Sequence, residues 1–549
     1  MIRRIATVGG LTLASRVTGF VRDVIMAAVL GAGPVADAFF VAFRLPNHFR
    51  AILAEGAFNA AFVPAYARTL EQSGLPAARL FSDRIAAALL VINLFLLGLA
   101  LVFTPSVVSL LAPGLDQDPT RYDLAVTLTR VTFPALLLVS MQTMISDELN
   151  ANGRFATAAG APILLNICMV LTLSVAYWFP NACLAAAWGV LSAGVAQVLL
   201  VGVDAERSGF GLRFRVPRLD DPTRRFLKAL GPAIIGAGGV QLALFADTLI
   251  ASFLPTGALS ALYYADRINQ LPIGVVGIAV GTVLLPEMSR RLAAGDVRGA
   301  ASAQARGIQL ALLLTVPCAA AAIGVPELIM RALFARGAFT IADAAAAGAT
   351  LAAYAIGLLP FVMLRSFTAP FYARGDTLTP VKATLLAASV NVALKVILMG
   401  PLAQVGLAFA TSVGAWINLT LLWFFARRQD LAVSGAGLRP VLKLLGAGVV
   451  LGISLYLGNL AIAHALAAMP HLREETTLAL LILLGGAIYA VVVLLLLGRN
   501  WPHNLLKSVG ASADRALPPK RSPIPSDQGG AYTATQETPA SRDDILERL

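Results

Sequence analysis

Charged residues are scarce in this sequence. Asp, Glu, Lys and Arg make up 13% of its 549 residues, whereas an ordinary soluble domain carries about 25%. Hydrophobic residues make up 58%, and apolar runs recur along most of the chain. Each run is about 20 residues long, enough to cross a bilayer as a helix. The composition excludes an ordinary soluble protein and predicts an all-α polytopic membrane protein.

Motifs of catalysis and metal binding are also lacking. The three cysteines, Cys168, Cys183 and Cys318, have no CxxC spacing, which argues against a disulfide framework or a cysteine-bound metal. The four histidines lack metal-ligand spacing, and no GxxxxGK[ST] phosphate loop occurs. We therefore expect no enzyme, no metal and no cofactor. The net charge of +12 lies mainly in loops between the apolar runs, so we expect no nucleic-acid partner.

The apolar pattern predicts fourteen transmembrane spans, near residues 5–30, 36–65, 85–110, 122–148, 156–179, 183–203, 229–253, 259–288, 307–325, 345–371, 381–400, 405–426, 441–462 and 476–497. Most Lys and Arg residues fall in loops on the side of the N-terminus. The opposite loops hold only Arg121, Arg331, Arg336 and Arg473. Cytoplasmic loops are enriched in these residues, so both termini are expected in the cytoplasm.

The two halves of the chain contain matching residues 222 positions apart: Pro64 and Pro286, Arg84 and Arg306, and Gly153 and Gly375. With six spans per half, both halves enter the membrane in the same direction. Such parallel repeats usually enclose a substrate site between them. We expect an N-terminal six-helix lobe over 1–205, a basic cytoplasmic linker over 206–228, a C-terminal six-helix lobe over 229–428, two extra transmembrane helices over 429–500 and a disordered cytoplasmic tail over 501–549.

Several charges fall inside the predicted spans, above all in "SRVTGFVRD" (15–23), "DAFFVAFRLPNHFRAILAE" (37–55) and "YYADRINQLP" (263–272). A charge facing lipid at the bilayer centre costs about 2.5–3.5 kcal/mol, so these side chains should face a wet interior or pair with one another. Arginines outnumber carboxylates there, and guanidinium groups match phosphate oxygens in bidentate geometry. The pattern predicts a transporter for an amphipathic, phosphate-bearing substrate.

Three small features accompany these charges. Arg16 and Asp23 are seven residues apart and should share one helix face, with Gly19 between them permitting the close approach of another backbone. Pro46 and Pro272 lie within predicted spans. We expect Pro46 to interrupt its helix beside a cavity, where freed carbonyls are tolerated.

The stretches "SRVTGFVRD", "DAFFVAFRLPN", "AEGAF", "AFVP", "YYADR" and "GTVLLP" resemble those of the MurJ (MviN) flippases, from about residue 5 to 500. This family belongs to the multidrug/oligosaccharidyl-lipid/polysaccharide exporter superfamily. The resemblance implies a fourteen-helix, two-lobed protein of the bacterial cytoplasmic (inner) membrane. It would move lipid II, the undecaprenyl-pyrophosphate-linked disaccharide-pentapeptide, from the inner to the outer leaflet by alternating access. An exporter of another polyprenyl-linked glycan or of drugs is the alternative.

The implied partners are lipid II and membrane lipids, with cell-wall synthesis proteins as candidate partners of a monomer. By the resemblance, the substrate-binding residues are Arg16, Arg22, Arg50 and Arg267, and the acidic positions are Asp37 and Glu55. The charge pattern adds further gating or charge-partner residues, Asp23, Arg44 and Asp266.

Some family members bind sodium in the second lobe through two aspartates, an asparagine and a threonine. In this sequence Asp247, Asn391 and Thr411 match three of these positions, but Lys395 replaces the second aspartate. We therefore expect no sodium site of this kind. The Lys395 ammonium should instead pair with Asp247, as the remnant of a cation site.

Overall fold

A computed structural model describes residues 2–50, 57–213, 215, 218, 220–428, 438–466, 472–501 and 505. Within these ranges the chain forms helices and no strand, so the all-α prediction is confirmed. The helices are α1 (Ile2–Leu30), α2 (Pro34–Arg50), α3 (Ala57–Val102), α4 (Thr104–Leu111), η2 (Pro113–Gln117), α5 (Pro119–Thr132), α6 (Pro134–Ala151), α7 (Ala156–Ser174), η3 (Ala176–Trp178), α8 (Ala182–Arg207), α9 (Asp221–Ser252), α10 (Ala258–Pro272), η4 (Ile273–Gly277), α11 (Ile278–Ala293), α12 (Val297–Gly324), α13 (Pro326–Phe334), α14 (Ile341–Ala355), α15 (Leu358–Ala373), α16 (Leu378–Arg428), α17 (Leu438–Ala465) and α18 (Arg473–Leu497).

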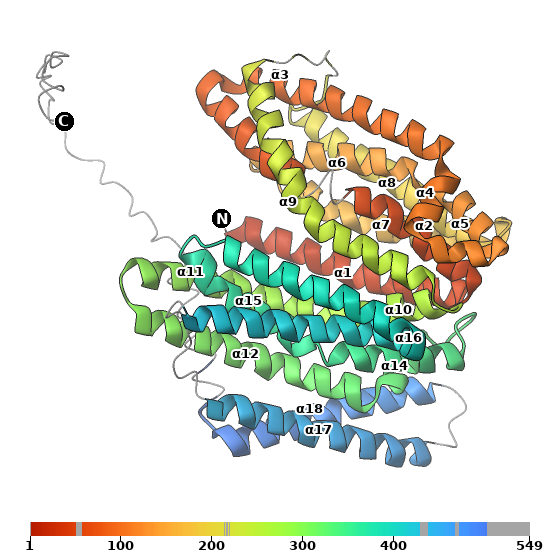
Figure 1. Ribbon diagram of the computed structural model, residues 1–549, viewed down its shortest axis with the longest axis vertical. Coiled ribbons are helices and arrows are strands. Elements are labelled where there is room, and N and C mark those ends of the chain that lie inside the picture. The colour runs from red at the N-terminus through yellow and green to blue at the C-terminus, as the bar shows by residue number, and fades with distance from the viewer. Residues whose placement is uncertain are drawn as a thin grey trace, which may run out of the picture.

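The helices gather into two bundles (Figure 1). In the first bundle, α1 packs on α7, α7 on α8, α2 on α5 and α3 on α6. In the second bundle, α10 packs on α14, and α15 packs on both α11 and α12. Helices α17 and α18 pair with each other, and α17 lies along α12. Helix α9 contacts α3 of the first bundle and α16 of the second, so it connects the two.

Corresponding helices in the two bundles end in the same way. Gly153 after α6 and Gly375 after α15 both have φ of 78°, a conformation that glycine adopts without steric cost. In each case the residue after the glycine donates its N–H to the carbonyl five residues earlier, at 2.9 Å, as in a Schellman-type helix end. The two glycines of this predicted pair therefore end their helices in the same way, and the repeat itself stays a prediction.

Nine helical segments in the described part of the chain are long and apolar enough to cross a membrane. One of them, α16, covers two predicted spans and has a kink at Ala403 (φ 45°). The nine therefore account for ten of the fourteen predicted spans. The other four correspond to α1, α2, α9 and α10 with α11, which carry the intramembrane charges singled out in the sequence. The chain is a multi-pass helical membrane protein.

Two local predictions are wrong. The loop expected between the second and third spans is helical, because α3 runs from Ala57 to Val102 with a break at Gly74 (φ 76°). Pro46 does not interrupt its helix, since α2 continues to Arg50. The Pro46 ring leaves one backbone carbonyl of α2 without its helical hydrogen bond. Because Pro46 lines a cavity, this carbonyl need not face lipid.

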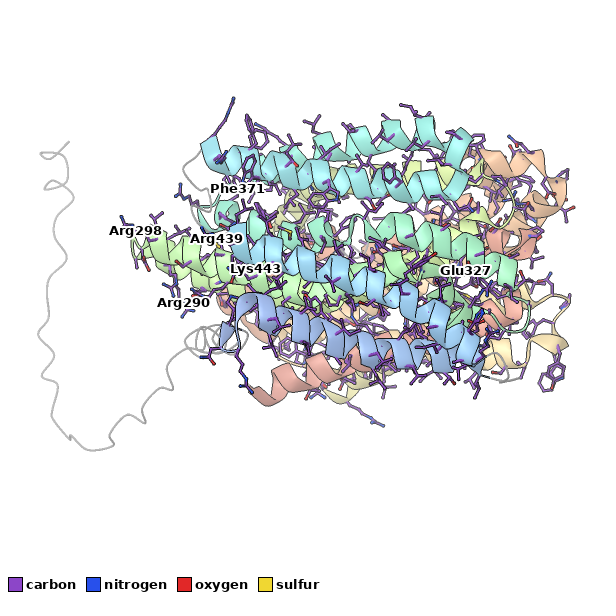
Figure 2. The ribbon with its side chains drawn as sticks, turned by 90° about the horizontal axis from the view of Figure 1, so that it is seen from below. Arg290, Arg298, Glu327, Phe371, Arg439 and Lys443 are labelled. Carbon is purple, nitrogen blue, oxygen red and sulfur yellow. The ribbon has the colours of Figure 1, made fainter. Side chains whose placement is uncertain are left out.

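Basic side chains mark one end of the second bundle. Arg290, Arg298, Arg439 and Lys443 lie toward one end of the helices, whereas Glu327 lies toward the opposite end (Figure 2). Helix α11, which carries Arg290, lies at the other end of the molecule from α2 and α10 (Figure 1). We call the end of the molecule that carries these four basic residues the basic end.

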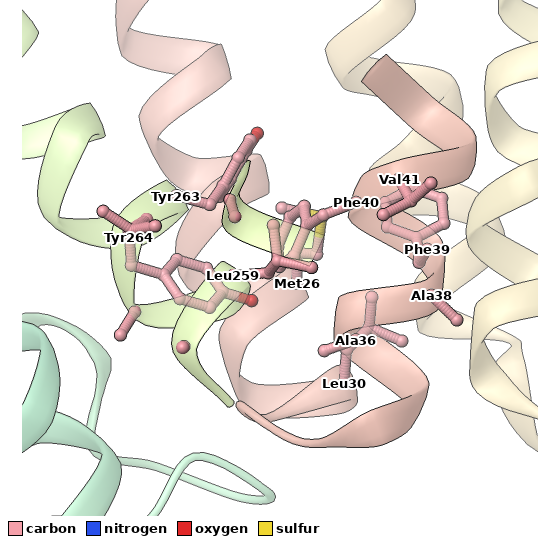
Figure 3. Packing of buried hydrophobic residues seen from close by; sticks show 14 of the residues in the cluster. Met26, Leu30, Ala36, Ala38, Phe39, Phe40, Val41, Leu259, Tyr263 and Tyr264 are labelled. Atoms are coloured by element: carbon pink, nitrogen blue, oxygen red, sulfur yellow. The ribbon is translucent and has the colours of Figure 1, made fainter. Parts of the chain in front are cut away.

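The bundles meet through aromatic side chains at the end away from the basic end. Met26 of α1 and Phe40 of α2 pack near Tyr263 and Tyr264 of α10 (Figure 3), and all four are at most 2% exposed. The rings of Phe40 and Tyr263 stack with centroids 4.0 Å apart. This dry contact closes the space between the bundles, and we call it the closed end.

Two glycines bring backbones into contact at the closed end. Gly31 (φ 68°) follows α1, and Gly337 (φ 60°) lies between α13 and α14. A Cβ atom on Gly31 would lie 2.5 Å from the Ala338 carbonyl oxygen, and one on Gly337 would lie 2.2 Å from that of Ala28. The Ala338 N–H donates to the Ala28 carbonyl at 2.7 Å. Side chains at either glycine would push the bundles apart.

The described part of the linker between the bundles is tied to the first bundle. Asp83 of α3 accepts a hydrogen bond from the Arg213 N–H at 2.8 Å, and Arg84 pairs with Asp220. Asp220 also caps α9 by accepting from the Thr223 N–H at 3.1 Å. Partial burial acts to raise the pKa of Asp220, but the Thr223 hydrogen bonds and the Arg84 charge outweigh it and lower that pKa. The Asp220 carboxylate therefore stays ionised and stabilises the N-terminus of α9.

Candidate functional site

Three arginines meet in a cavity between the bundles. The cavity measures about 270 Å³, and its lining includes Arg16, Arg22 and Asp23 of α1, Asn166 of α7 and Arg267 of α10. Among the described residues that line it, three cations face one carboxylate. We call it the cationic cavity. Its excess positive charge favours an anionic ligand.

Asp23 links the two bundles inside the cationic cavity. Its Oδ1 accepts from Arg22 Nε and Nη2 at 3.0 and 2.7 Å, and from the Tyr263 hydroxyl at 3.2 Å. Arg267 Nε lies 3.8 Å from Asp23 Oδ2, and the Arg267 guanidinium carbon lies 4.7 Å from the Tyr263 ring centroid, a favourable cation–π geometry. One carboxylate of α1 thus orients two side chains of α10.

Asn166 fixes the orientation of Arg22. Its Oδ1 accepts from Arg22 Nη1 at 3.0 Å, and its Nδ2 donates to the Ser15 carbonyl and the Thr18 hydroxyl, both at 3.0 Å. The expected close approach at Gly19 is made by this amide rather than by a backbone, since a Cβ there would lie 3.5 Å from Asn166 Nδ2. Sequence reasoning missed Asn166, although a lone amide in the apolar run "LLNICMV" was a usable signal.

Arg16 shares the cavity with Asp23, as the helix periodicity predicts, but Asp23 pairs with Arg22 and Arg267 instead. No ion pair joins Arg16 to another described residue. Its guanidinium rests against Gly274, where a Cβ would lie 2.2 Å from Nη1. Gly274 belongs to η4, a π-helical segment directly after Pro272, and this irregularity makes room for Arg16.

Asp37 caps a helix of the other bundle at the closed end. Its carboxylate, on α2, accepts from the Gly257 N–H at 2.7 Å, the Ser260 N–H at 3.0 Å and the Ser260 hydroxyl at 2.6 Å. These groups form the N-terminus of α10, where a negative charge is favourable. Arg121 Nη2 completes the contact at 3.2 Å. We call these four residues the Asp37 latch.

Arg121 appears in the sequence as a loop arginine, and that placement is wrong. It lies in α5, is 6% exposed and pairs with the fully buried Asp37. Sequence reasoning also missed Ser260 as a partner of Asp37. Neither contact has a local sequence signal, because both depend on how α2 lies beside α5 and α10.

Two further predicted charge partners, Arg44 and Asp266, do not line the cationic cavity. Asp266 accepts a hydrogen bond from Gln270 on the same helix. The structure shows no ion pair between Arg44 and another described residue. The side chain of Arg50 and the whole of Glu55 lie outside the described residues, so their predicted roles stay predictions.

The expected contact between Lys395 and Asp247 is present. Lys395 Nζ donates to Asp247 Oδ1 at 2.5 Å, and Lys395 is only 3% exposed. The Thr411 hydroxyl donates to the Leu407 carbonyl at 3.0 Å. Asn391 Oδ1 is buried and accepts no hydrogen bond from the described residues. The ammonium therefore occupies the position beside Asp247 that a bound cation would need.

This chain matches a known protein family. The family model described as "Lipid II flippase MurJ" matches residues 26–497. The chain belongs to the MurJ family. Among similar MurJ proteins, the "Probable lipid II flippase MurJ" of Rhizobium meliloti is 41% identical over 500 residues, which cover 89% of this chain and 92% of the relative. The "Lipid II flippase MurJ" of Burkholderia cenocepacia is 33% identical over 466 residues, covering 82% and 89%.

Solved structures agree on the MurJ fold. A structure described as "Lipid II flippase MurJ, inward closed conformation" has a TM-score of 0.74 at 24% identity, covering 89% of this chain and 98% of that one. An inward-facing multidrug resistance MATE family transporter of the MOP superfamily has a TM-score of 0.64 at 15% identity, covering 76% and 95%. The resemblance predicted from the sequence motifs is confirmed for the family and the fold.

Proposed function

We propose that this protein is a flippase that moves lipid II from the inner to the outer leaflet of the bacterial cytoplasmic membrane by alternating access. The observation that carries the proposal is the cationic cavity, in which Arg16, Arg22 and Arg267 from two bundles converge with one carboxylate. A pyrophosphate supplies the negative charges and the paired oxygens that such guanidinium groups bind. Family membership supports the choice of lipid II over other phosphate-bearing lipids.

The proposed topology has fourteen spans, in two parallel six-helix lobes followed by two further helices. The boundaries are those predicted from the sequence. The basic end would face the cytoplasm, because cytoplasmic loops concentrate Lys and Arg, and both termini would lie there. The closed end would then face the outside. With its outer end closed, the cavity would be reached from the inner leaflet, where the substrate is made, and the protein would work as a monomer.

In the proposed mechanism the substrate competes with Asp23. Arg22 and Arg267 share Asp23 before the substrate arrives, while Arg16 pairs with no described residue. The pyrophosphate would bind Arg16 first and then displace Asp23 from Arg267. Arg50 would join them as a fourth ligand. Neutralising this cluster removes the repulsion between the bundles, which allows them to close around the headgroup.

Helix α10 would transmit this event to the closed end. It carries Ser260 of the Asp37 latch and, seven residues later, Arg267 of the cationic cavity. At 1.5 Å per residue these two are about 10 Å apart along a rigid helix. A movement of Arg267 toward the substrate therefore also strains the hydrogen bonds of Asp37 to Ser260. The latch would release when the cavity is filled.

Gly274 offers a test of how Arg16 is positioned. We expect Gly274→Ala to weaken the binding of undecaprenyl pyrophosphate to the purified protein by about tenfold or more, since one charge-assisted contact is worth roughly 1.5–3 kcal/mol. The added methyl group would displace the Arg16 guanidinium. Gly277→Ala is the matched control in the same segment, because its Cβ would meet Arg365 Cγ at an ordinary 3.9 Å. Equal affinity of the two variants would contradict this role of Arg16.

Sodium should not drive this protein. Because Lys395 already supplies the positive charge beside Asp247, we expect the outward exposure of lipid II in cells to be unchanged when choline replaces sodium in the medium. The measurement compares both media in cells whose only flippase is this chain. A fall in lipid II exposure in the sodium-free medium, with membrane potential held equal, would show that the Lys395–Asp247 pair does not replace a sodium site.

The proposed function is tested by complementation. A bacterium is depleted of its own lipid II flippase while the full chain is expressed and its membrane insertion verified. We expect the wild-type chain to restore growth and cell shape. If a correctly inserted chain restores neither, lipid II is not its substrate, and another polyprenyl-linked glycan or a drug takes its place.

A further inference from the structure

A second, larger cavity lies inside the first bundle. It measures about 730 Å³, within the range of about 300–1,000 Å³ that is usual for small-molecule sites. Pro162 and Leu165, one turn apart on the same face of α7, line both this cavity and the cationic cavity, so the two cavities adjoin at this face. We call it the amide cavity.

The amide cavity is polar but uncharged. No Asp, Glu, Lys or Arg occurs among the described residues that line it. Its polar groups are amides and hydroxyls, contributed by Thr12, Asn59, Gln142, Thr143, Ser146, Asn150 and Gln197. A charged ligand would lose its hydration here without gaining a counter-charge, which is costly. The lining instead suits a neutral ligand with many hydroxyl and amide groups.

Several of these groups are held ready to form hydrogen bonds. The Gln142 side chain donates to the Ser146 hydroxyl at 2.8 Å, and Gln197 donates to the Ala161 carbonyl at 3.0 Å, which fixes the orientation of both amides. Asn59 Oδ1 is buried and accepts no hydrogen bond from the described residues. A buried acceptor without a donor is unusual in a folded protein. Asn59 lines the cavity, so a small rotation of its side chain would let a ligand hydroxyl or N–H reach this acceptor.

Two aromatic rings complete the lining. Phe43 of α2 and Phe155, at the start of α7, lie on the cavity wall. Carbohydrates present hydroxyl groups at their edges and apolar C–H groups on their faces. Aromatic walls combined with neutral amides therefore match a sugar better than they match a peptide that carries carboxylates.

We infer that the amide cavity binds the uncharged glycan of the substrate while the cationic cavity binds its pyrophosphate. This inference rests on the proposed function and specifies its substrate site. A sugar bonded directly to the pyrophosphate must lie next to the arginines, and the shared wall of α7 places the amide cavity there. The acidic peptide stays outside this uncharged cavity.

The test measures the affinity of the purified full chain, in lipid nanodiscs, for three probes. These are undecaprenyl pyrophosphate without sugar, the same lipid carrying the disaccharide, and complete lipid II with its peptide. We expect Asn59→Leu and Gln142→Leu each to weaken the binding of both glycan-bearing lipids by about tenfold, the effect of one or two lost hydrogen bonds. Binding of the sugar-free lipid should not change. Asn418→Leu makes the same substitution outside both cavities and should bind all three normally.

Different failures have different meanings. If the Asn59 and Gln142 variants bind the glycan-bearing lipids as tightly as the wild type, or lose affinity for all three probes alike, the glycan site is refuted while the proposed function stands. If their loss appears only with the peptide present, the cavity holds the peptide and the inference is wrong. If the wild type binds none of the probes, the proposed function fails together with the inference.

Discussion

Arg267→Gln is expected to abolish growth rescue in cells that depend on this chain. Arg267 supplies the charge that the second bundle brings to the cationic cavity, and its side chain is 34% exposed, so a ligand can reach it. Charge-assisted hydrogen bonds contribute roughly 1.5–3 kcal/mol each. Losing two of them at a pyrophosphate would reduce the affinity by at least about a hundredfold. The variant also removes the ion pair between Asp23 and α10, which couples the bundles.

The control for this prediction is Arg365→Gln. Arg365 is an exposed arginine of α15 that lines neither cavity, so we expect this variant to grow like the wild type. Arg267→Lys keeps the charge but not the planar fork, and should rescue growth partly. Growth rates are compared at equal protein levels in the membrane. Wild-type growth of Arg267→Gln would contradict the role given to the arginine.

Asp37→Ala is expected to separate the bundles at the closed end. The substitution removes the acceptor of three hydrogen bonds to α10 and leaves Arg121 buried without its partner. Removing one member of a buried ion pair costs about 3–5 kcal/mol. A change of this size is enough to invert a tenfold or hundredfold preference for the closed end, because each 1.4 kcal/mol is a factor of ten.

The separation can be measured with spin labels. Val35 of α2 and Ile341 of α14 are exposed residues near the closed end on opposite bundles, and they can be changed to cysteine in a chain whose three native cysteines are replaced. Pulsed electron–electron double resonance should show a longer distance between the two labels in the Asp37→Ala variant than in the labelled chain that keeps Asp37. Asp116→Ala, which removes a carboxylate outside the latch, serves as the control. An unchanged distance distribution would show that Asp37 does not hold the bundles together.

The sequence predicted the class of fold and the residues of the cationic cavity for a definite physical reason. Arginines within apolar spans must face a wet interior, so Arg16, Arg22 and Arg267 could be assigned to one cavity before any contact was known. The helix period placed Arg16 and Asp23 on one face. It could not say which arginine Asp23 would bind, because that depends on how α1 is rotated toward α10.

Neutral and distant partners could not be predicted in this way. Asn166 carries no charge and is therefore not among the intramembrane charges that mark the cavity, although it orients Arg22. Arg121 looks like a loop residue until α5 is packed beside α2. The amide cavity is built from α1, α2, α3, α6, α7 and α8, and no short stretch of sequence reveals it. These partners and this cavity are determined by how the helices pack against one another.

The central claim is that the arginines of the cationic cavity carry lipid II across the membrane. It is tested most directly by the amount of lipid II on the outer face of intact cells. Cells depleted of their own flippase and expressing this chain are treated with a membrane-impermeant enzyme that cleaves lipid II, and the cleaved fraction is measured. We predict that the wild-type chain restores the cleaved fraction, whereas Arg16→Ala at the same level does not. An equal cleaved fraction for both would contradict the account.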